Sequence, residues 1–354
     1  MNDRDKNQER FRYDNQFYPP HFTHLNVANI HICFASDDRY APHAAALVAS
    51  IMSNKSPDEE ISFHFFSDET APWTQEAFRQ MSREMGFHLS IYEVSSEQFD
   101  NLPVMPYMKQ SRTTYLRLLM HRQLPDSLDK VLYLDVDMIV MSSLKELYLT
   151  DISAHYAAAV ATPARIINPR FGHWYFNAGT ILLNLKKYRE EHMEEQAVKY
   201  ARENVDRLTM ADQDILNYIF KGNVVFLSQK WNARQRTMPW KATVHTHGID
   251  SFPAGCIEEH REAESNPCII HYHTQQKPWN PNYRYAWGEF YWKHLRKTPF
   301  YKEVLRRYYW SLPYYVPRMT IRFLLTPVRL LRDKLRSHWR QITSQSLTAN
   351  STEQ

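Results

Sequence analysis

The chain has 354 residues, of which 43% are hydrophobic and 14% aromatic, so it can bury one large core or two modest ones. Three cysteines (Cys33, Cys256 and Cys268) are too few for a disulfide framework, and we expect buried thiols in a reducing, cytoplasmic location. The first residues lack the apolar stretch of a signal peptide, and no run of about 18 apolar residues is present, so we expect no transmembrane helix.

The net charge of +4 is unevenly distributed along the chain. Residues 301–340 contain ten Lys and Arg side chains against two acidic ones, which leaves the rest of the chain net acidic. The basic character therefore belongs to the C-terminal part. No nucleic-acid-binding motif accompanies it, so we do not expect a nucleic-acid partner.

Strand-like and helical patterns alternate in the first part of the chain. The expected elements are a strand at 29–36, a helix at 43–52, a strand at 61–68, a helix at 73–85, a strand at 88–94 and a helix at 111–123. This alternation predicts an α/β layered domain with a mixed, mostly parallel sheet.

The next segment, KVLYLDVDMIV (130–140), is an apolar strand that runs into two aspartates, Asp135 and Asp137. Side chains at positions i and i+2 of a strand point the same way, so the two carboxylates are expected to converge. Hard oxygen ligands at a strand end suit Mn²⁺ or Mg²⁺, with phosphates of a ligand completing the coordination. A strand end that simply emerges into water is the alternative.

The remaining elements continue the α/β pattern. They are strands at 155–162 and 180–185, helices at 186–204 and 212–220, and strands at 223–228 and 267–273. The chain has only seven glycines and no glycine-rich phosphate-binding loop. If a nucleotide binds, a metal and basic side chains must therefore neutralise its phosphates.

Six segments, in order, resemble the motifs of glycosyltransferase family 8, and the bacterial lipopolysaccharide-core α-glucosyl- and galactosyltransferases are the most similar members. The segments are FASDDRY (34–40), SRTTYLRL (111–118), YLDVDMIV (133–140), YFNAGTILLNL (175–185), ADQDILN (211–217) and HYHTQQKPW (271–279). The resemblance implies a GT-A-type nucleotide-sugar-binding domain, a UDP-glucose or UDP-galactose donor, Mn²⁺ (or Mg²⁺), and transfer with retention of the α configuration.

The resemblance also implies roles for individual residues. The metal ligands would be Asp135, Asp137 and His271, two carboxylates and an imidazole that Mn²⁺ accepts. The donor-binding residues would be Asp37, Tyr40, Arg117, Asn177, Ala178 and Lys277. The catalytic residues would be Gln213, Asp212 and Asp137.

Gln213 matches the residue nearest the anomeric carbon of the donor. A neutral amide is a poor nucleophile, which disfavours a covalent double displacement. The favoured mechanism is front-face attack by the acceptor hydroxyl, while the metal and Lys277 stabilise the departing UDP.

We predict four segments: a polar N-terminal arm (1–25), the GT-A domain (26–298), a basic amphipathic helical extension (299–341) and a disordered tail (342–354). The extension mixes apolar and basic residues, typical of a helix on an anionic membrane surface. This predicts a protein peripheral to the inner face of the cytoplasmic membrane, acting on a glycan or lipid-linked saccharide. The alternative is a helix packed on the main domain with a solvated basic face.

Two other functions fit parts of the pattern. A haloacid-dehalogenase-like phosphohydrolase also places Asp-x-Asp after an apolar strand, but Ile139 stands where that class has Thr or Val. A non-catalytic sugar-binding protein with a decayed transferase fold is the second alternative. The sequence does not distinguish glucose from galactose as the donor sugar, because that choice depends on contacts to one hydroxyl.

Overall fold

The computed structural model describes residues 28–68, 70–102, 112–162, 168–234 and 256–315. The predicted N-terminal arm, most of the basic extension and the tail lie outside these residues. The chain divides into two compact units, a larger one that runs to Gln275 and includes Tyr285–Tyr301, and a smaller one formed by Gln276–Arg284 and the chain from Lys302 onward.

A seven-stranded sheet forms the centre of the larger unit, in the order β3-β2-β1-β4-β7-β6-β8. Its strands are β1 (Ala28–Ser36), β2 (Glu59–Ser67), β3 (His88–Glu93), β4 (Lys130–Leu134), β6 (Ala157–Ala161), β7 (Phe176–Asn184) and β8 (Val224–Leu227). Neighbouring strands are parallel except where β7 pairs with β4 and β6. The prediction of a mixed, mostly parallel sheet is confirmed.

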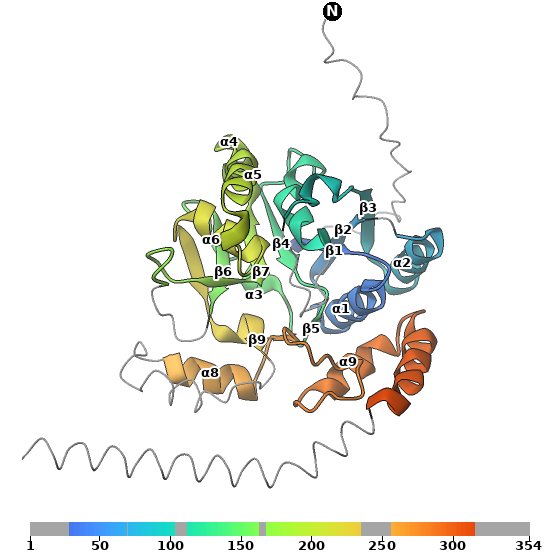
Figure 1. Cartoon of the computed structure of the whole chain (residues 1–354). Coiled ribbons are helices and arrows are strands. Elements are labelled where there is room, and N and C mark those ends of the chain that lie inside the picture. Colours follow the sequence, from blue (N-terminus) through green and yellow to red (C-terminus); the bar gives the residue numbers. More distant parts are fainter. Residues whose placement is uncertain (1–27, 69, 103–111, 163–167, 235–255, 316–354) are drawn as a thin grey trace, which may run out of the picture. The chain divides into compact units, whose positions relative to one another are not determined.

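The first strands are buried on both faces, which explains their nearly continuous apolar sequences. Helices α1 (Ala41–Asn54) and α2 (Pro72–Met85) follow β1 and β2, and Figure 1 shows them beside this part of the sheet. Helix α1 is rich in alanine because almost all of it is buried. Helix α2 ends at Met85, and the residue that caps it, Gly86, has a left-handed backbone (φ 72°) that suits glycine.

Two predicted helices differ in the structure. The segment predicted as a helix at 111–123 forms short 3-10 helices, Arg112–Leu118 and Met120–Arg122. Thr113 and Thr114 are β-branched, and Arg117 Nε donates to the Thr114 carbonyl oxygen, 3.0 Å away, so regular α-helix is disfavoured. The helix predicted at 186–204 is broken into α4 (Leu185–Glu190) and α5 (Met193–Glu203) by His192, which has a φ of 50°.

The aspartate segment also differs from a single continuous strand. Strand β4 ends at Leu134, and β5 (Met138–Val140) joins a second, three-stranded sheet with β10 (Ile269–His271) and β9 (Ala233–Arg234). Asp135 and Asp137 therefore lie in the turn between two sheets. The expected convergence of the two carboxylates comes from this turn, not from the alternation of side chains along one strand.

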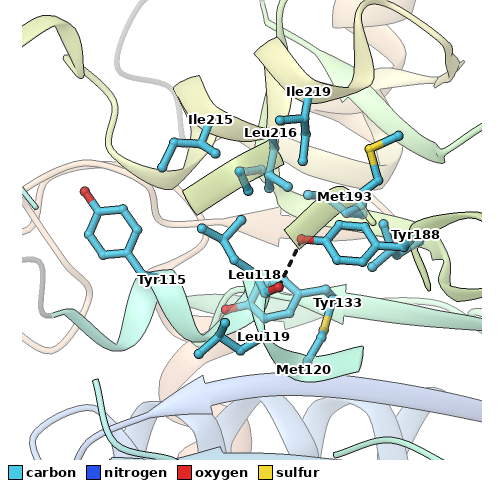
Figure 2. Packing of buried hydrophobic residues seen from close by; sticks show 14 of the residues in the cluster. Tyr115, Leu118, Leu119, Met120, Tyr133, Tyr188, Met193, Ile215, Leu216 and Ile219 are labelled. Carbon is cyan, nitrogen blue, oxygen red and sulfur yellow. Dashed lines mark hydrogen bonds between the residues drawn. The ribbon is translucent and has the colours of Figure 1, made fainter. Parts of the chain in front are cut away.

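A buried hydrophobic cluster includes side chains of the 3-10 helix Arg112–Leu118. Figure 2 shows side chains of this helix packed with others from β4, α4, α5 and α6 (Asp212–Phe220). The Tyr188 hydroxyl donates to the Leu118 carbonyl oxygen at 3.0 Å, so a polar atom inside the cluster is satisfied. The cluster holds in place the helix that carries Arg117.

The remaining described α-helices are α3 (Lys145–Tyr148), α8 (Cys256–Ser265), α9 (Gly288–Leu295) and a helix at residues 301–315. The last of these confirms helical structure in the C-terminal region, and its Trp310 side chain is 82% exposed. No helix in the described part of the chain is long and apolar enough to span a membrane.

Candidate active site

Asp135, Asp137 and His271 form a group that could hold a metal ion, with ligand atoms within 4.8 Å of one another. His271 Nε2 lies 3.2 Å from Asp137 Oδ1 and 3.8 Å from Asp135 Oδ2. The turn is fixed at both ends, because the Asp135 amide donates to the Gly179 carbonyl oxygen and the Tyr272 amide donates to that of Asp137, both at 2.9 Å. Antiparallel pairing of β10 with β5 places His271 beside the turn.

The group fits a hard divalent cation. Two carboxylates and one imidazole are ligands that Mn²⁺ accepts, and the negative charges of the two carboxylates balance the two positive charges of the cation. Gly179 leaves the necessary space, since a Cβ atom there would lie 2.6 Å from His271 Cε1 and 2.9 Å from Asp135 Oδ2. The absence of a side chain at this position is therefore a requirement of the cluster.

Replacing Gly179 with Ala is expected to lower the affinity for Mn²⁺ by about 10- to 100-fold, because the methyl group must displace His271 or Asp135. Titration calorimetry with Mn²⁺ measures this directly. Gly86→Ala is the control: nothing lies within 4 Å of its Cβ position, and its left-handed backbone makes the variant less stable without affecting metal. Wild-type affinity in the Gly179→Ala variant would contradict the assignment.

Arg117 is buried and pairs with two carboxylates. Its Nη2 lies 2.8 Å from Asp135 Oδ1, and its Nε lies 3.0 Å from Asp212 Oδ2. Its Nη1 donates to the Ala178 carbonyl oxygen at 2.6 Å, and the guanidinium carbon lies 4.2 Å from the Tyr133 ring centroid. Arg117 thus joins the metal cluster to the start of α6 and to β7.

Asp212 is almost completely buried, and burial raises the pKa of its carboxyl to about 6, against the opposing charge of Arg117. The Thr114 hydroxyl donates to Asp212 Oδ1 at 2.5 Å. For Arg117, burial is the largest single effect and would lower the pKa, but the electrostatic interactions with Asp212, Tyr133 and Asp135 and the hydrogen bond to Asp135 together outweigh it and raise the pKa above its ordinary value. The two side chains therefore form a buried ion pair in which each charge stabilises the charged form of the other.

A group of hydrogen-bonded polar residues lies beside this pair, where the first residues of β7 meet the start of α6. Asn177 Nδ2 donates to Gln213 Oε1 at 2.9 Å, and the Ala178 amide donates to the same oxygen at 3.1 Å. Asn217, one turn further along α6, exchanges hydrogen bonds with the amide and carbonyl of Phe176. Helix α6 and strand β7 are thus held together where the predicted sugar-binding residues lie.

The pair of aspartates after β1 has two different roles. Asp37 Oδ1 accepts from the Tyr40 amide at 2.9 Å, which shapes the turn before α1. Asp38 instead accepts from the Ala71 amide and the Thr74 hydroxyl, so it supports the start of α2. Burial and, to a smaller extent, the charge of Asp137 raise the pKa of Tyr40 to about 12. Tyr40 therefore interacts electrostatically with a carboxylate of the metal cluster.

Lys277 belongs to the smaller unit, where its Nζ lies 5.9 Å from the Trp279 ring centroid. The larger unit brings together the other predicted residues of the metal and sugar sites. It also contains residues that sequence reasoning missed, namely Thr114, Gly179, Asn217 and Asn232. Thr114 and Asn217 lie inside recognised motifs, whereas Asn232 had no sequence signal, because a lone Asn is common in turns.

The fold matches solved glycosyltransferases. The structure of the galactosyltransferase LgtC with donor and acceptor sugar analogues is similar, with a TM-score of 0.66 and 27% identity over 76% of this chain and 96% of that one. The sheet and the cluster of two aspartates and a histidine thus define a glycosyltransferase of the GT-A fold. This similarity disfavours the phosphohydrolase alternative.

Sequence comparison identifies the family. The model of glycosyl transferase family 8 matches residues 31–282, so the chain belongs to that family. General stress protein A of Bacillus subtilis is 23% identical and covers 76% of this chain and 94% of its own length. Lipopolysaccharide 1,3-galactosyltransferase of Salmonella typhimurium is 24% identical, covering 75% and 76% respectively. The resemblance to this family is confirmed.

Proposed function

We propose that the chain is an α-retaining hexosyltransferase that moves glucose or galactose from its UDP derivative to a sugar hydroxyl of a lipopolysaccharide core or similar glycan. The observation that supports this most directly is the cluster of Asp135, Asp137 and His271 beside the hydrogen-bonded pair Asn177–Gln213. A metal site next to amide groups suits a diphosphate joined to a hexose. Family membership and the similarity to lipopolysaccharide transferases support the same reaction.

The metal would be Mn²⁺ or Mg²⁺, held by Asp135, Asp137 and His271. When bound, it would neutralise the diphosphate of the donor and stabilise the charge of the departing UDP. Lys277 would pair with a diphosphate oxygen. Asp37 and Tyr40 would hold the uracil and ribose, because a carboxylate can accept from the uracil N–H and a phenol ring can stack on the base.

Arg117, Asn177 and Ala178 would orient the hexose. Asn177 offers an amide that can both donate to and accept from hydroxyls. In the structure Arg117 is occupied by Asp135 and Asp212, so its contribution to donor binding would be to keep these carboxylates oriented as well as to contact the sugar.

We favour front-face attack of the acceptor hydroxyl on the anomeric carbon. Gln213, the residue proposed to lie nearest that carbon, has a neutral amide, and its Oε1 accepts from Asn177 and Ala178. Asp212 is the neighbouring carboxylate, but Thr114 and Arg117 engage both of its oxygens. Neither side chain is arranged as a nucleophile, and the engaged carboxylate of Asp212 is not arranged as a base, so the leaving phosphate would take the proton of the acceptor hydroxyl.

The acceptor and the membrane association extend this proposal. Relatives named as lipopolysaccharide 1,3-galactosyl- and 1,2-glucosyltransferases suggest a lipid-linked core saccharide at the inner face of the cytoplasmic membrane. The basic residues between 301 and 340 would then bind anionic lipid. Cosedimentation with phosphatidylglycerol vesicles at low and high salt tests the idea, and salt-insensitive or absent binding would exclude it.

UDP release from a panel of UDP-sugars, with Mn²⁺ or with EDTA, tests the function. We expect release from one UDP-hexose, and we expect EDTA to abolish it. Because some transferases need their acceptor, UDP with Mn²⁺ is also tested for its effect on the unfolding temperature. Neither UDP release nor stabilisation would reject the proposal and favour the decayed, non-catalytic protein.

A further inference from the structure

A chain of four hydrogen-bonded side chains connects the proposed sugar site with the metal cluster. Asn177 Nδ2 donates to Gln213 Oε1 at 2.9 Å, and Asn177 Oδ1 faces Asn232 Nδ2 at 2.7 Å. Asn232 Oδ1 then lies 2.9 Å from His271 Nδ1. Asn232 is the one link in this chain that belongs to no recognised motif.

Two backbone amides determine the direction of every hydrogen bond in the chain. The Ala178 N–H points at the amide of Gln213 at 3.1 Å, and the Gly179 N–H points at the amide of Asn177 at 3.1 Å. A backbone N–H can only donate, so both of these side-chain atoms must be oxygens. The atom of Asn232 that faces Asn177 Oδ1 must therefore be its NH₂ group.

The orientation of Asn232 follows, and with it the state of His271. With its NH₂ group toward Asn177, Asn232 presents its oxygen to His271 Nδ1, which must carry a hydrogen. With this hydrogen held on Nδ1, the nitrogen left to bind a metal is Nε2, the atom that faces Asp137 and Asp135. A metal ligand needs a lone pair at that nitrogen.

Asn232 is also held rigidly. It is fully buried at the end of the 3-10 helix Gln229–Asn232, directly before β9. Thr180 of β7 donates to the carbonyl oxygen of Trp231 at 3.0 Å, and β9 pairs with β10 beside His271. Both the side chain and the backbone of this residue are therefore fixed relative to β7 and β10.

We propose that Asn232 is a positioning residue that sets the tautomer and ring orientation of His271 for metal binding and couples the metal site to the hydrogen-bonded pair Asn177–Gln213 of the proposed sugar site. This inference rests on the proposed function for the identity of the metal and the donor. It predicts that both polar atoms of the Asn232 side chain matter: Oδ1 accepts from His271, and Nδ2 donates to Asn177.

Two variants separate the effects of these two hydrogen bonds. Asn232→Ala removes both, and Mn²⁺ affinity is expected to fall by about 10- to 100-fold. Asn232→Asp can still accept from His271 Nδ1 but cannot donate to Asn177. Its Mn²⁺ affinity should stay within a few-fold of wild type, while KM for the donor rises about tenfold, because a carboxylate oxygen would face Asn177 Oδ1 and leave it only the Gly179 N–H as a donor.

Asn184→Ala is a matched control. Asn184 is also a buried amide, and its NH₂ group donates to the carbonyl oxygens of Ile152 and His155 at the opposite end of β7. The control should lose stability without a change in Mn²⁺ affinity. Unfolding temperatures of all variants show how much of each effect is structural.

The experiment combines Mn²⁺ titration calorimetry with ¹⁵N NMR of the imidazole nitrogens in metal-free, histidine-labelled protein, with His271→Gln used for assignment. We expect a hydrogen on Nδ1 of His271 in the wild type and in Asn232→Asp, and loss of that hydrogen in Asn232→Ala, where only Nε2, which faces Asp137, keeps a partner. An unchanged tautomer with unchanged Mn²⁺ affinity in Asn232→Ala would overturn the inference. Absence of Mn²⁺ binding in the wild type would instead reject the proposed metal site.

Discussion

Replacing Asp137 with Asn is expected to lower hexose transfer by roughly a thousandfold or more and to remove most of the Mn²⁺ affinity. Asp137 Oδ1 lies 3.2 Å from His271 Nε2, so the carboxylate and the imidazole face the same point. An amide keeps the shape of the side chain but removes the negative charge that attracts the cation. UDP release and Mn²⁺ titration measure the two effects.

The fold of this variant should remain intact. The carbonyl oxygen of Asp137 accepts from the Tyr272 amide whatever the side chain is, and the carboxylate itself is partly exposed. Asp38→Asn is a useful control, because Asp38 supports the start of α2 and should affect stability but not metal affinity. Near-normal transfer by Asp137→Asn would reject the assignment of the metal site.

Replacing Arg117 with Met is expected to destabilise the protein by about 3–5 kcal/mol near pH 8, because it leaves Asp212 buried without its cation. Activity should fall with it, since Arg117 also pairs with Asp135 and holds the Ala178 carbonyl oxygen. Urea unfolding of the wild type and the variant at several pH values measures the free energy of unfolding.

The pH dependence of this loss has a definite sign. Burial already raises the pKa of Asp212 to about 6 in the wild type, and losing Arg117 must raise it further. A carboxyl with a raised folded-state pKa stabilises the fold below its unfolded pKa, and this stabilisation disappears as the pH rises through the folded pKa. The variant should therefore be closer to the wild type at pH 5 than at pH 8.

A double variant separates charge from packing. Adding Asp212→Asn to Arg117→Met removes the unpaired buried carboxylate and should recover part of the stability at pH 8. It should also flatten the pH dependence of the difference from the wild type. If the single variant lost the same stability at pH 5 and pH 8, lost packing, and not the ion pair, would explain the effect.

Much of the fold could be predicted from local patterns. The apolar runs of β1, β2 and β4 are buried on both faces, as their sequences indicate, and the alternation with α1 and α2 implies a parallel sheet. The residues of the metal cluster were also predicted, because two aspartates after a buried strand are conspicuous and the family resemblance supplies His271.

Local patterns were insufficient for three segments. The 3-10 helix Arg112–Leu118 was expected to be α-helical, but the Arg117 guanidinium takes a carbonyl oxygen of its own helix. The single helix predicted at 186–204 is broken at His192. The two aspartates converge because the chain turns between two sheets, a feature that strand periodicity does not contain.

The sequence by itself determined the class of fold, the family and the residue types available at the site, because periodicity, burial and motif spacing are properties of neighbouring residues. Only the tertiary structure decided which of those residues meet. It paired Arg117 with Asp212, 95 positions apart, and placed Asn232 between Asn177 and His271. The physical reason is that hydrogen-bond direction and ion pairing depend on sheet order and register, which place segments far apart in sequence within 3 Å or so of one another.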